Sequence, residues 1–230
     1  MLSNDDIQYI KGGTHPQLYF SDDMKFIKGK IGFTAVYDTE NNVFSIINPN
    51  DNNFVGIKFT GEFDIEIELE GFTSGFPKLV VLNDLPKKAE RHFYTDQDQL
   101  IGCVCGPVEE MEFMQSFNIK DYIEEKVVPF LYGQLFFNEY EKWPWEDYSH
   151  NTLGILESYA NSKNNQFSDE MKLRLKRQKK DWTTLENILL SKNNPKGHTT
   201  CFCNRKDHIR RCHPLAWEGL KKLYADQGRG

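Results

Sequence analysis

Three cysteines and a histidine gather near the C-terminal end of the sequence, in the stretch CFCNRKDHIRRCHP. One residue separates Cys201 from Cys203, and after eight further residues Cys212 is followed directly by His213. Structural zinc sites take four thiolate or imidazole ligands in a tetrahedron. The four side chains therefore predict a closed site for structural Zn²⁺, without an open position for catalysis.

Two alternatives remain open for this stretch. The cysteines could be ordinary surface thiols, although exposed thiols are rarely grouped so tightly. His198 and His208 could compete as ligands, but we expect both of these histidines to face solvent.

A second cysteine pair, Cys103 and Cys105, lies in the stretch LIGCVCGP. A thiol becomes a nucleophile when a nearby positive charge or a helix N-terminus lowers its pKa. Arg91 and His92 precede Cys103 by twelve and eleven residues, so the chain could fold them back toward it. The alternative is that both cysteines are buried core residues of a short strand.

The formal net charge of −6 argues against broad binding to nucleic acid, because phosphate binders usually need a basic face. The first residues carry neither a basic segment nor an apolar run, and no apolar run reaches the length of a membrane span. An odd number of clustered cysteines without a secretory signal is typical of a reducing compartment. We therefore expect a cytoplasmic protein without a membrane partner. The acidic total also argues against a nucleic-acid partner, and the alternative is that the basic loop of the cysteine stretch binds one.

The elements that position these residues change in character along the chain. Residues 25–83 are rich in β-branched and aromatic residues, and the stretch DIEIELE alternates apolar and acidic side chains like a strand with one wet face. Residues 84–107 lack a regular pattern and predict an ordered coil with a short apolar stretch. From residue 108 onward, apolar residues recur at helical spacing, and Pro129 should start or kink a helix.

A β-meander followed by helices predicts an α+β fold, with an antiparallel sheet and flanking helices. We expect three parts: a core over residues 1–162, a helical extension over 163–197, and a zinc-binding module with the tail over 198–230.

The cysteine spacing at the C-terminal end resembles the SEC-C motif, a small zinc-binding module found at the C-terminus of the SecA translocase. That motif runs C-x-C, eight residues, then C-C or C-H, and all four ligand positions match here. The loop departs from the family, because NRKDHIRR replaces its usual glycines. SEC-C modules usually contact other molecules, so the resemblance implies an accessory module that does not itself carry the catalytic activity.

The stretch from FDIEIELE to GCVCGPVEE resembles the core of ubiquitin-conjugating enzymes, in particular their bacterial branch. In that family a β-meander leads to a proline-containing flap, a histidine, an aspartate-bearing turn and the catalytic cysteine. The matching residues follow one another in this order: Pro77, Pro86, Arg91, His92, Asp98 (or Asp96) and Pro107. Alignment on the proline four residues after the nucleophile makes Cys103 the catalytic cysteine and Cys105 the runner-up.

Two features depart from the family. His92 lies a few residues further from the cysteine than the bacterial pattern has it. The His-Pro-Asn triplet of the eukaryotic enzymes, whose asparagine supports the oxyanion, is absent from the stretch RHFYTD.

A further block, WPWEDYSHNTLGILESY, resembles a segment of bacterial conjugating-enzyme-like proteins that carry a SEC-C tail. This match places His150 near the cysteine as a proton acceptor for an incoming amine. The alternative is that His150 is a polar residue at the start of a helix.

Bacterial proteins that combine both parts are mostly encoded in CBASS anti-phage operons, beside a cGAS-like nucleotidyltransferase. The resemblance implies an enzyme that takes the C-terminus of this protein partner as a thioester and passes it to an amine. It implies Cys103 as nucleophile, His92 or His150 as base or orienting group, and Asp98 as a possible acid that orients the amine. The alternative is a catalytically inactive scaffold that binds and regulates the partner.

Overall fold

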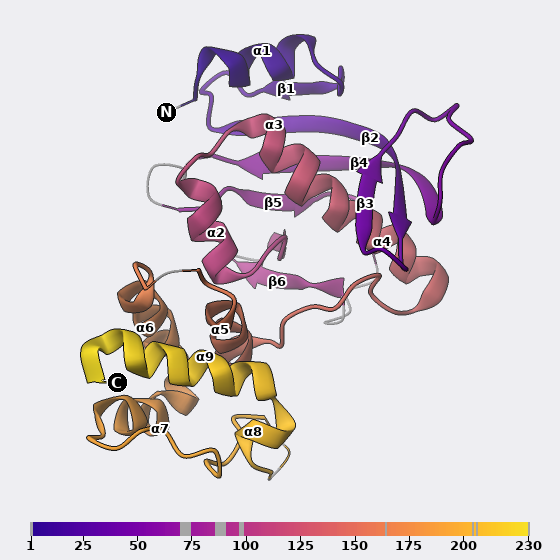
Figure 1. Cartoon of the computed structure of the whole chain (residues 1–230). Coiled ribbons are helices and arrows are strands. Elements are labelled where there is room, and N and C mark those ends of the chain that lie inside the picture. Colours follow the sequence, from indigo (N-terminus) through magenta and orange to yellow (C-terminus); the bar gives the residue numbers. More distant parts are fainter. Residues whose placement is uncertain are drawn as a thin grey trace. The chain divides into compact units, whose positions relative to one another are not determined.

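The computed structural model describes residues 2–69, 75–85, 91–96, 99–163, 165–203, 205 and 207–229. The fold is α+β, with an antiparallel sheet, flanking helices and a helical C-terminal region, as the sequence predicts (Figure 1). The contacts divide the chain into two compact units. Unit 1 comprises Met1–Val104 and Ser116–Glu146, and unit 2 comprises Cys105–Gln115 and Asp147–Gly230. The three-part division at 162/163 and 197/198 stays a prediction.

Unit 1 is built on a sheet whose described strands all pair antiparallel, in the order β1-β2-β4-β5-β7-β6, with β3 added on β2. The strands are β1 (Leu18–Phe20), β2 (Phe26–Asp38), β3 (Val43–Ile46), β4 (Ile57–Glu68), β5 (Lys78–Val81), β6 (Phe93–Asp96) and β7 (Gln99–Gly102). The long ladder between β2 and β4 runs from the pair Phe26 and Glu68 to the pair Tyr37 and Ile57.

The alternation predicted for DIEIELE is present in β4. Phe63, Ile65 and Ile67 are buried, so one face of this strand lies in the core. The acidic side chains of the other face pair across the sheet, Glu62 with Lys30 at 2.8 Å and Glu66 with Lys28 at 2.7 Å. Sheet register is therefore specified both by burial and by charge.

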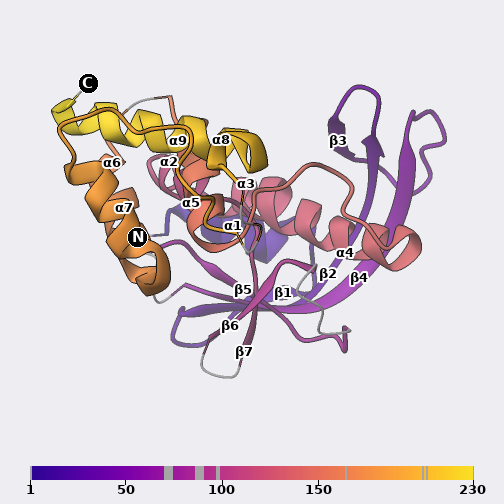
Figure 2. The same cartoon turned by 90° about the horizontal axis from the view of Figure 1, so that it is seen from below.

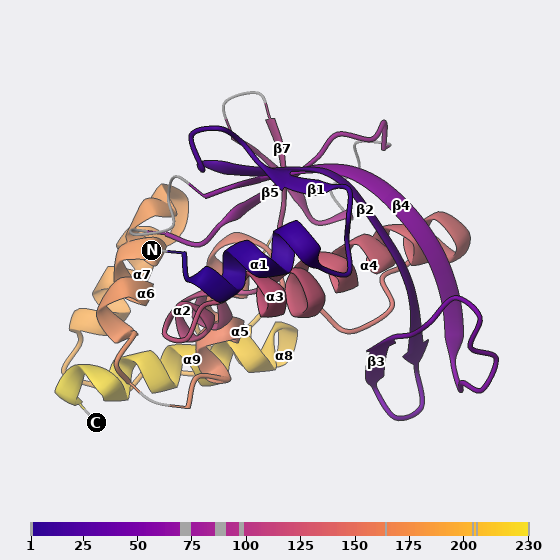
Figure 3. The same ribbon diagram turned by 90° about the horizontal axis from the view of Figure 1, so that it is seen from above.

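Four helical segments of unit 1 lie on one face of this sheet, as Figures 2 and 3 show. They are α1 (Asn4–Gly12), α3 (Ile119–Tyr122), the π-helical turn η2 (Ile123–Val127) and α4 (Val128–Tyr140). Pro129 is the second residue of α4, directly after the π-helical turn η2, so its missing N–H falls where the helical backbone changes from π to α. The sequence predicts that this proline starts or kinks a helix, and α4 begins one residue before it.

The prediction of an irregular coil over residues 84–107 is wrong for part of that stretch. Residues 93–96 and 99–102 form the antiparallel pair β6 and β7, and β7 also pairs with β5. Alternation along these short strands is weak, and their pairing with the neighbouring strand decides their structure.

Unit 2 is helical. It contains α2 (Pro107–Met114), α5 (Asn151–Ala160), α6 (Ser168–Arg177), α7 (Lys179–Leu190), α8 (Ile209–Cys212), α9 (Pro214–Tyr224) and the π-helical turn η3 (Ala225–Arg229). α5 and α9 approach so closely that a Cβ atom on Gly219 would stand 1.8 Å from the Leu156 carbonyl oxygen. Among the described residues of both units, no helix is both long and apolar enough to cross a membrane.

This close approach gives a stability prediction. Gly219→Ala should lower the free energy of unfolding by about 1–3 kcal/mol, because the methyl group forces α5 and α9 apart. Gly12→Ala is the matched control, because a Cβ atom there meets nothing within 4 Å. Urea denaturation followed by circular dichroism measures both. Equal stability of the two variants would contradict the packing described.

Candidate functional site

The four predicted zinc ligands come together in unit 2. The chain turns back on itself between them, because Thr200 and His208 form an antiparallel bridge and the Cys201 N–H donates to the Asp207 carbonyl at 2.8 Å. The short helix α8 follows at once. Its hydrogen bond from the Cys212 N–H to the His208 carbonyl, 3.0 Å long, carries the chain back to the first two cysteines.

The four ligand atoms of Cys201, Cys203, Cys212 and His213 all lie within 4.8 Å of one another. Cys201 Sγ is 3.1 Å from His213 Nδ1, and Cys203 Sγ is 3.4 Å from Cys212 Sγ. Zinc binds sulfur at about 2.3 Å, which separates two sulfur ligands of a tetrahedron by about 3.8 Å. The group could therefore hold one metal ion, and its soft donors are compatible with zinc.

Protonation of these thiols depends on their surroundings. Cys201 is 5% exposed, and burial raises the pKa of its thiol to about 12. At Cys203 burial acts in the same direction, but the backbone N–H of Arg205 and the neighbouring thiols outweigh it and lower the pKa. The Arg205 N–H donates to Cys203 Sγ at 3.4 Å. In metal sites, hydrogen bonds of this kind from residues outside the ligand set orient the ligands. An incoming ion must displace the Cys201 proton, so metal binding should release protons.

The ligand set is attached to the core of unit 2. Cys201 and Ile209 belong to the same buried cluster as Leu156 of α5 and Leu220 of α9, and the other two cysteines pack against that cluster. A metal ion held here would fix the segment between α7 and α9 to the rest of the unit.

The metal prediction is tested by Cys201→Ser. Metal content, measured by mass spectrometry with plasma ionisation, should fall from about one zinc per chain to near zero, and unit 2 should lose several kcal/mol of stability. Metal content of the unchanged chain should also fall between about pH 7 and pH 5, because the thiols regain their protons. Cys105→Ser makes the same exchange outside the ligand set and should keep the metal. A variant Cys201→Ser with full metal content would contradict the ligand assignment.

Cys103 lies in unit 1, directly after β7, and is exposed. Its N–H donates to the His92 carbonyl at 2.7 Å, which continues the β6–β7 ladder by one step beyond the pair Phe93 and Gly102. The structure therefore brings His92 and Cys103 side by side, although eleven residues separate them in the sequence.

His92 is held in an unusual conformation. Its φ of 56° lies in the left-handed region, and its imidazole packs on the indole of Trp143 with 4.6 Å between ring centroids. Trp143 in turn needs Gly133 on α4, because a Cβ atom there would stand 2.6 Å from the indole. Sequence reasoning missed this indole as a partner of His92, since neither spacing nor pattern links the two residues.

Arg91 fixes the segment that carries His92. It is 3% exposed, and its guanidinium donates to the side-chain oxygens of Gln134, at 3.3 Å, and Asn138 on α4. Gln134 returns a bond from its amide to the Arg91 carbonyl at 2.9 Å, and the guanidinium lies 4.9 Å from the centre of the Phe137 ring. Burial lowers the pKa of Arg91, and among the described residues none of its partners is acidic. The cation is therefore held by neutral amides and an aromatic face.

The other sequence-predicted residues lie elsewhere. His150 belongs to unit 2, where it is exposed and occupies the N-cap position of α5 without a capping hydrogen bond from its side chain. There it lines a cavity of about 630 Å³ together with Cys203, His213 and the basic side chains of Arg177 and Lys180.

Cys105 is half-buried, one residue before the N-cap of α2. Asp98 lies outside the described residues. For Asp96, the alternative to Asp98, the structure describes the backbone pairing with Gln99. The roles of these residues stay predictions.

Comparison of the chain with protein-family models, with curated proteins and with solved structures finds no match. The resemblance to bacterial conjugating enzymes therefore rests on the residues quoted above.

The hydrogen bonds between Arg91 and the side chains of α4 give a further prediction. Arg91→Leu leaves the side chains of Gln134 and Asn138 without their donor, so the free energy of unfolding should fall by about 1–3 kcal/mol. Arg177→Leu makes the same exchange at an exposed position on α6 and should change it by less than about 0.5 kcal/mol. Both are measured by urea denaturation. If Arg91→Leu is as stable as the unchanged chain, the hydrogen bonds of Arg91 do not hold the segment before β6.

Proposed function

We propose that this protein is a cysteine-dependent conjugating enzyme of the bacterial ubiquitin-conjugating type. Cys103 accepts the C-terminus of a partner protein as a thioester and passes it to an amine. The observation that supports the proposal is the exposed Cys103 at the end of β7, joined by its backbone to His92 at 2.7 Å. The partner is a cGAS-like nucleotidyltransferase, and the setting is CBASS anti-phage signalling.

The chemistry has two steps. The Cys103 thiolate attacks the carbonyl carbon of an activated C-terminus, a thioester C–S bond forms, and the previous activating group leaves with its electron pair. An amine then attacks the thioester carbonyl, an amide C–N bond forms and the thiolate is released. The nitrogen gives up a proton in this second step, so a base must stand close to it.

His92 is the base or orienting group that the geometry of unit 1 favours, because imidazole accepts protons near neutral pH and this residue adjoins the nucleophile. His150 and Asp98 remain candidates for the same work. The chain carries no nucleotide-binding glycine motif, so the energy that activates the C-terminus must come from elsewhere.

The ligand group of unit 2 supplements this proposal. We infer that Cys201, Cys203, Cys212 and His213 hold structural zinc, which stabilises unit 2 and takes no part in acyl transfer. When bound, zinc supplies a closed tetrahedral link among the four side chains.

A second candidate is an inactive scaffold that binds and regulates the same partner. It is favoured by the residues after His92, Phe93 and Tyr94, which cannot supply the oxyanion support of the eukaryotic asparagine. An active enzyme must use another donor for that oxyanion, such as a backbone N–H.

A synthetic peptide thioester that ends in glycine tests the proposal. Unchanged protein should form an adduct that dithiothreitol removes, Cys103→Ala should form none, and Cys105→Ala should react normally. Non-reducing gels and intact mass measure the adduct. His92→Ala should slow transfer from the adduct to a lysine amine by about a hundredfold, because the base is lost.

The contrary outcomes are equally distinct. Loss of the adduct in Cys105→Ala and not in Cys103→Ala would move the nucleophile to Cys105. The absence of an adduct in the unchanged protein, with peptide thioester and with the partner, would favour the scaffold.

A further inference from the structure

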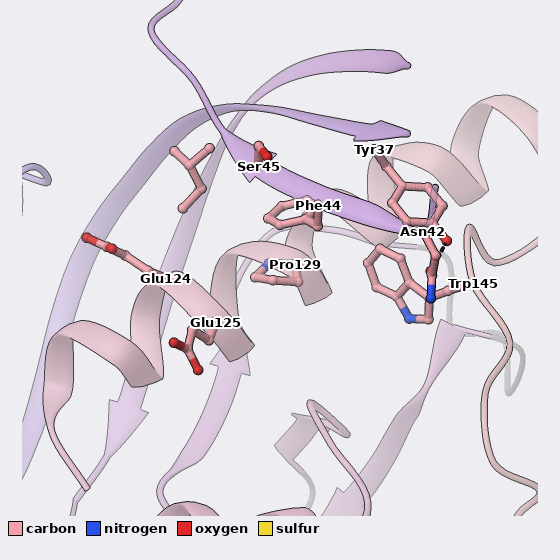
Figure 4. A pocket seen from close by; sticks show the side chains of 9 residues that line it. Tyr37, Asn42, Phe44, Ser45, Glu124, Glu125, Pro129 and Trp145 are labelled. Carbon is pink, nitrogen blue, oxygen red and sulfur yellow. Dashed lines mark hydrogen bonds between the residues drawn. The ribbon is translucent and has the colours of Figure 1, made fainter. Parts of the chain in front are cut away.

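A cavity of about 670 Å³ lies in unit 1, between β3 on one side and η2 with the start of α4 on the other (Figure 4). None of its lining residues belongs to the Cys103 site or to the metal ligands. The lining residues are Tyr37, Asn42, Phe44, Ser45, Ile46, Glu124, Glu125, Pro129 and Trp145.

One end of the cavity is aromatic. Tyr37 and Phe44 both meet the Trp145 indole edge to face, with ring centroids 5.4 Å and 6.3 Å apart. The Tyr37 hydroxyl donates to Asn42 Oδ1 at 2.6 Å, which fixes the ring at the turn between β2 and β3. These walls are suited to an apolar stem rather than to a fully hydrated group.

The other end is acidic. Glu124 and Glu125 stand on the π-helical turn η2, and Figure 4 shows both at the end of the cavity away from Trp145. Glu124 accepts a hydrogen bond from the Tyr9 hydroxyl at 3.2 Å, and no lysine, arginine or histidine among the described residues forms an ion pair with either glutamate. The residues that line the cavity thus include two carboxylates and no lysine, arginine or histidine. Single π-helical turns within helices are often found at functional sites.

The strand beside the cavity has an open edge. Among the described strands β3 pairs with β2 alone, and Val43 and Ile46 are 50% and 39% exposed. The Ile47 N–H donates to the Thr34 carbonyl, so antiparallel alternation turns the backbone groups of Phe44 and Ile46 away from β2. An extended peptide can pair with such an edge and place one side chain in the adjoining pocket.

We propose that β3 and this cavity bind an extended segment of a partner protein that inserts a lysine or arginine side chain. The aliphatic stem packs on Phe44 and Trp145, and the charged end meets Glu124 and Glu125. A long basic side chain matches both ends of the cavity, since its stem is apolar and its head is cationic. This binding requires no thioester and is independent of the chemistry proposed for Cys103.

Fluorescence anisotropy with a labelled peptide, Thr-Val-Thr-Lys-Thr-Val-Thr, tests the proposal on the full chain. Its matched partner carries norleucine in place of lysine, which keeps the stem and removes the charge. The lysine peptide should bind about five- to tenfold more tightly, and the difference should shrink at high salt. The indole N–H resonance of Trp145, assigned through Trp145→Phe, should shift as the lysine peptide is added.

Glu124→Gln combined with Glu125→Gln should remove the preference for lysine. Glu139→Gln is the control, because it removes one exposed charge from α4 outside the cavity. Glu125→Gln alone tests the same point at an exposed position if the double variant does not fold. The proposal is overturned by equal affinity for both peptides, by an unchanged preference in these variants, by an unshifted Trp145 resonance, or by no binding at millimolar concentration.

Discussion

The backbone hydrogen bond from the Cys103 N–H to the His92 carbonyl determines where the candidate chemistry of unit 1 lies. It is 2.7 Å long and extends the β6–β7 ladder past Gly102, so an exposed thiol and an imidazole-bearing residue become neighbours. The segment that leads into β6 is held in two ways. Arg91 donates to Gln134 of α4, and Trp143 packs on the imidazole of His92. Helix α4 therefore supports the strand pair β6 and β7 as well as the core of the sheet.

Unit 2 depends on a different constraint, the four-ligand group at the junction of α8 and α9. Cys201 lies in the core of the unit, where an ion would replace a buried protonated thiol by a metal–thiolate bond. His213 is the last residue before α9, so one ligand also fixes the start of that helix. Stability and metal content should accordingly change together in this part of the chain.

Local patterns in the sequence were enough for several features. The alternation in β4 predicted which side chains are buried, Pro129 marked the change from the π-helical turn to α4, and the cysteine spacing predicted the ligand group that the structure brings together. Each of these signals depends on residues close to one another in the chain.

Other features depend on distant residues and left no such signal. Arg91 meets its amide partners 43 and 47 residues away, and the short strands β6 and β7 form because neighbouring strands pair with them. The helix α1 escaped prediction although Ser3 and Asp6 form a capping box at its start. The cavity beside β3 forms where the strands β2 and β3 approach the π-helical turn η2. Sequence periodicity does not reveal that these distant segments come together.

The central claim is that Cys103 carries the acyl group. Tandem mass spectrometry of the unchanged protein, after reaction with a glycine-terminated peptide thioester and digestion at low pH, locates that group directly. The account predicts the acyl group on Cys103, with Cys105 and the three cysteines of the ligand group unmodified. An acyl group found on Cys105 or on a cysteine of the ligand group, and not on Cys103, would contradict it.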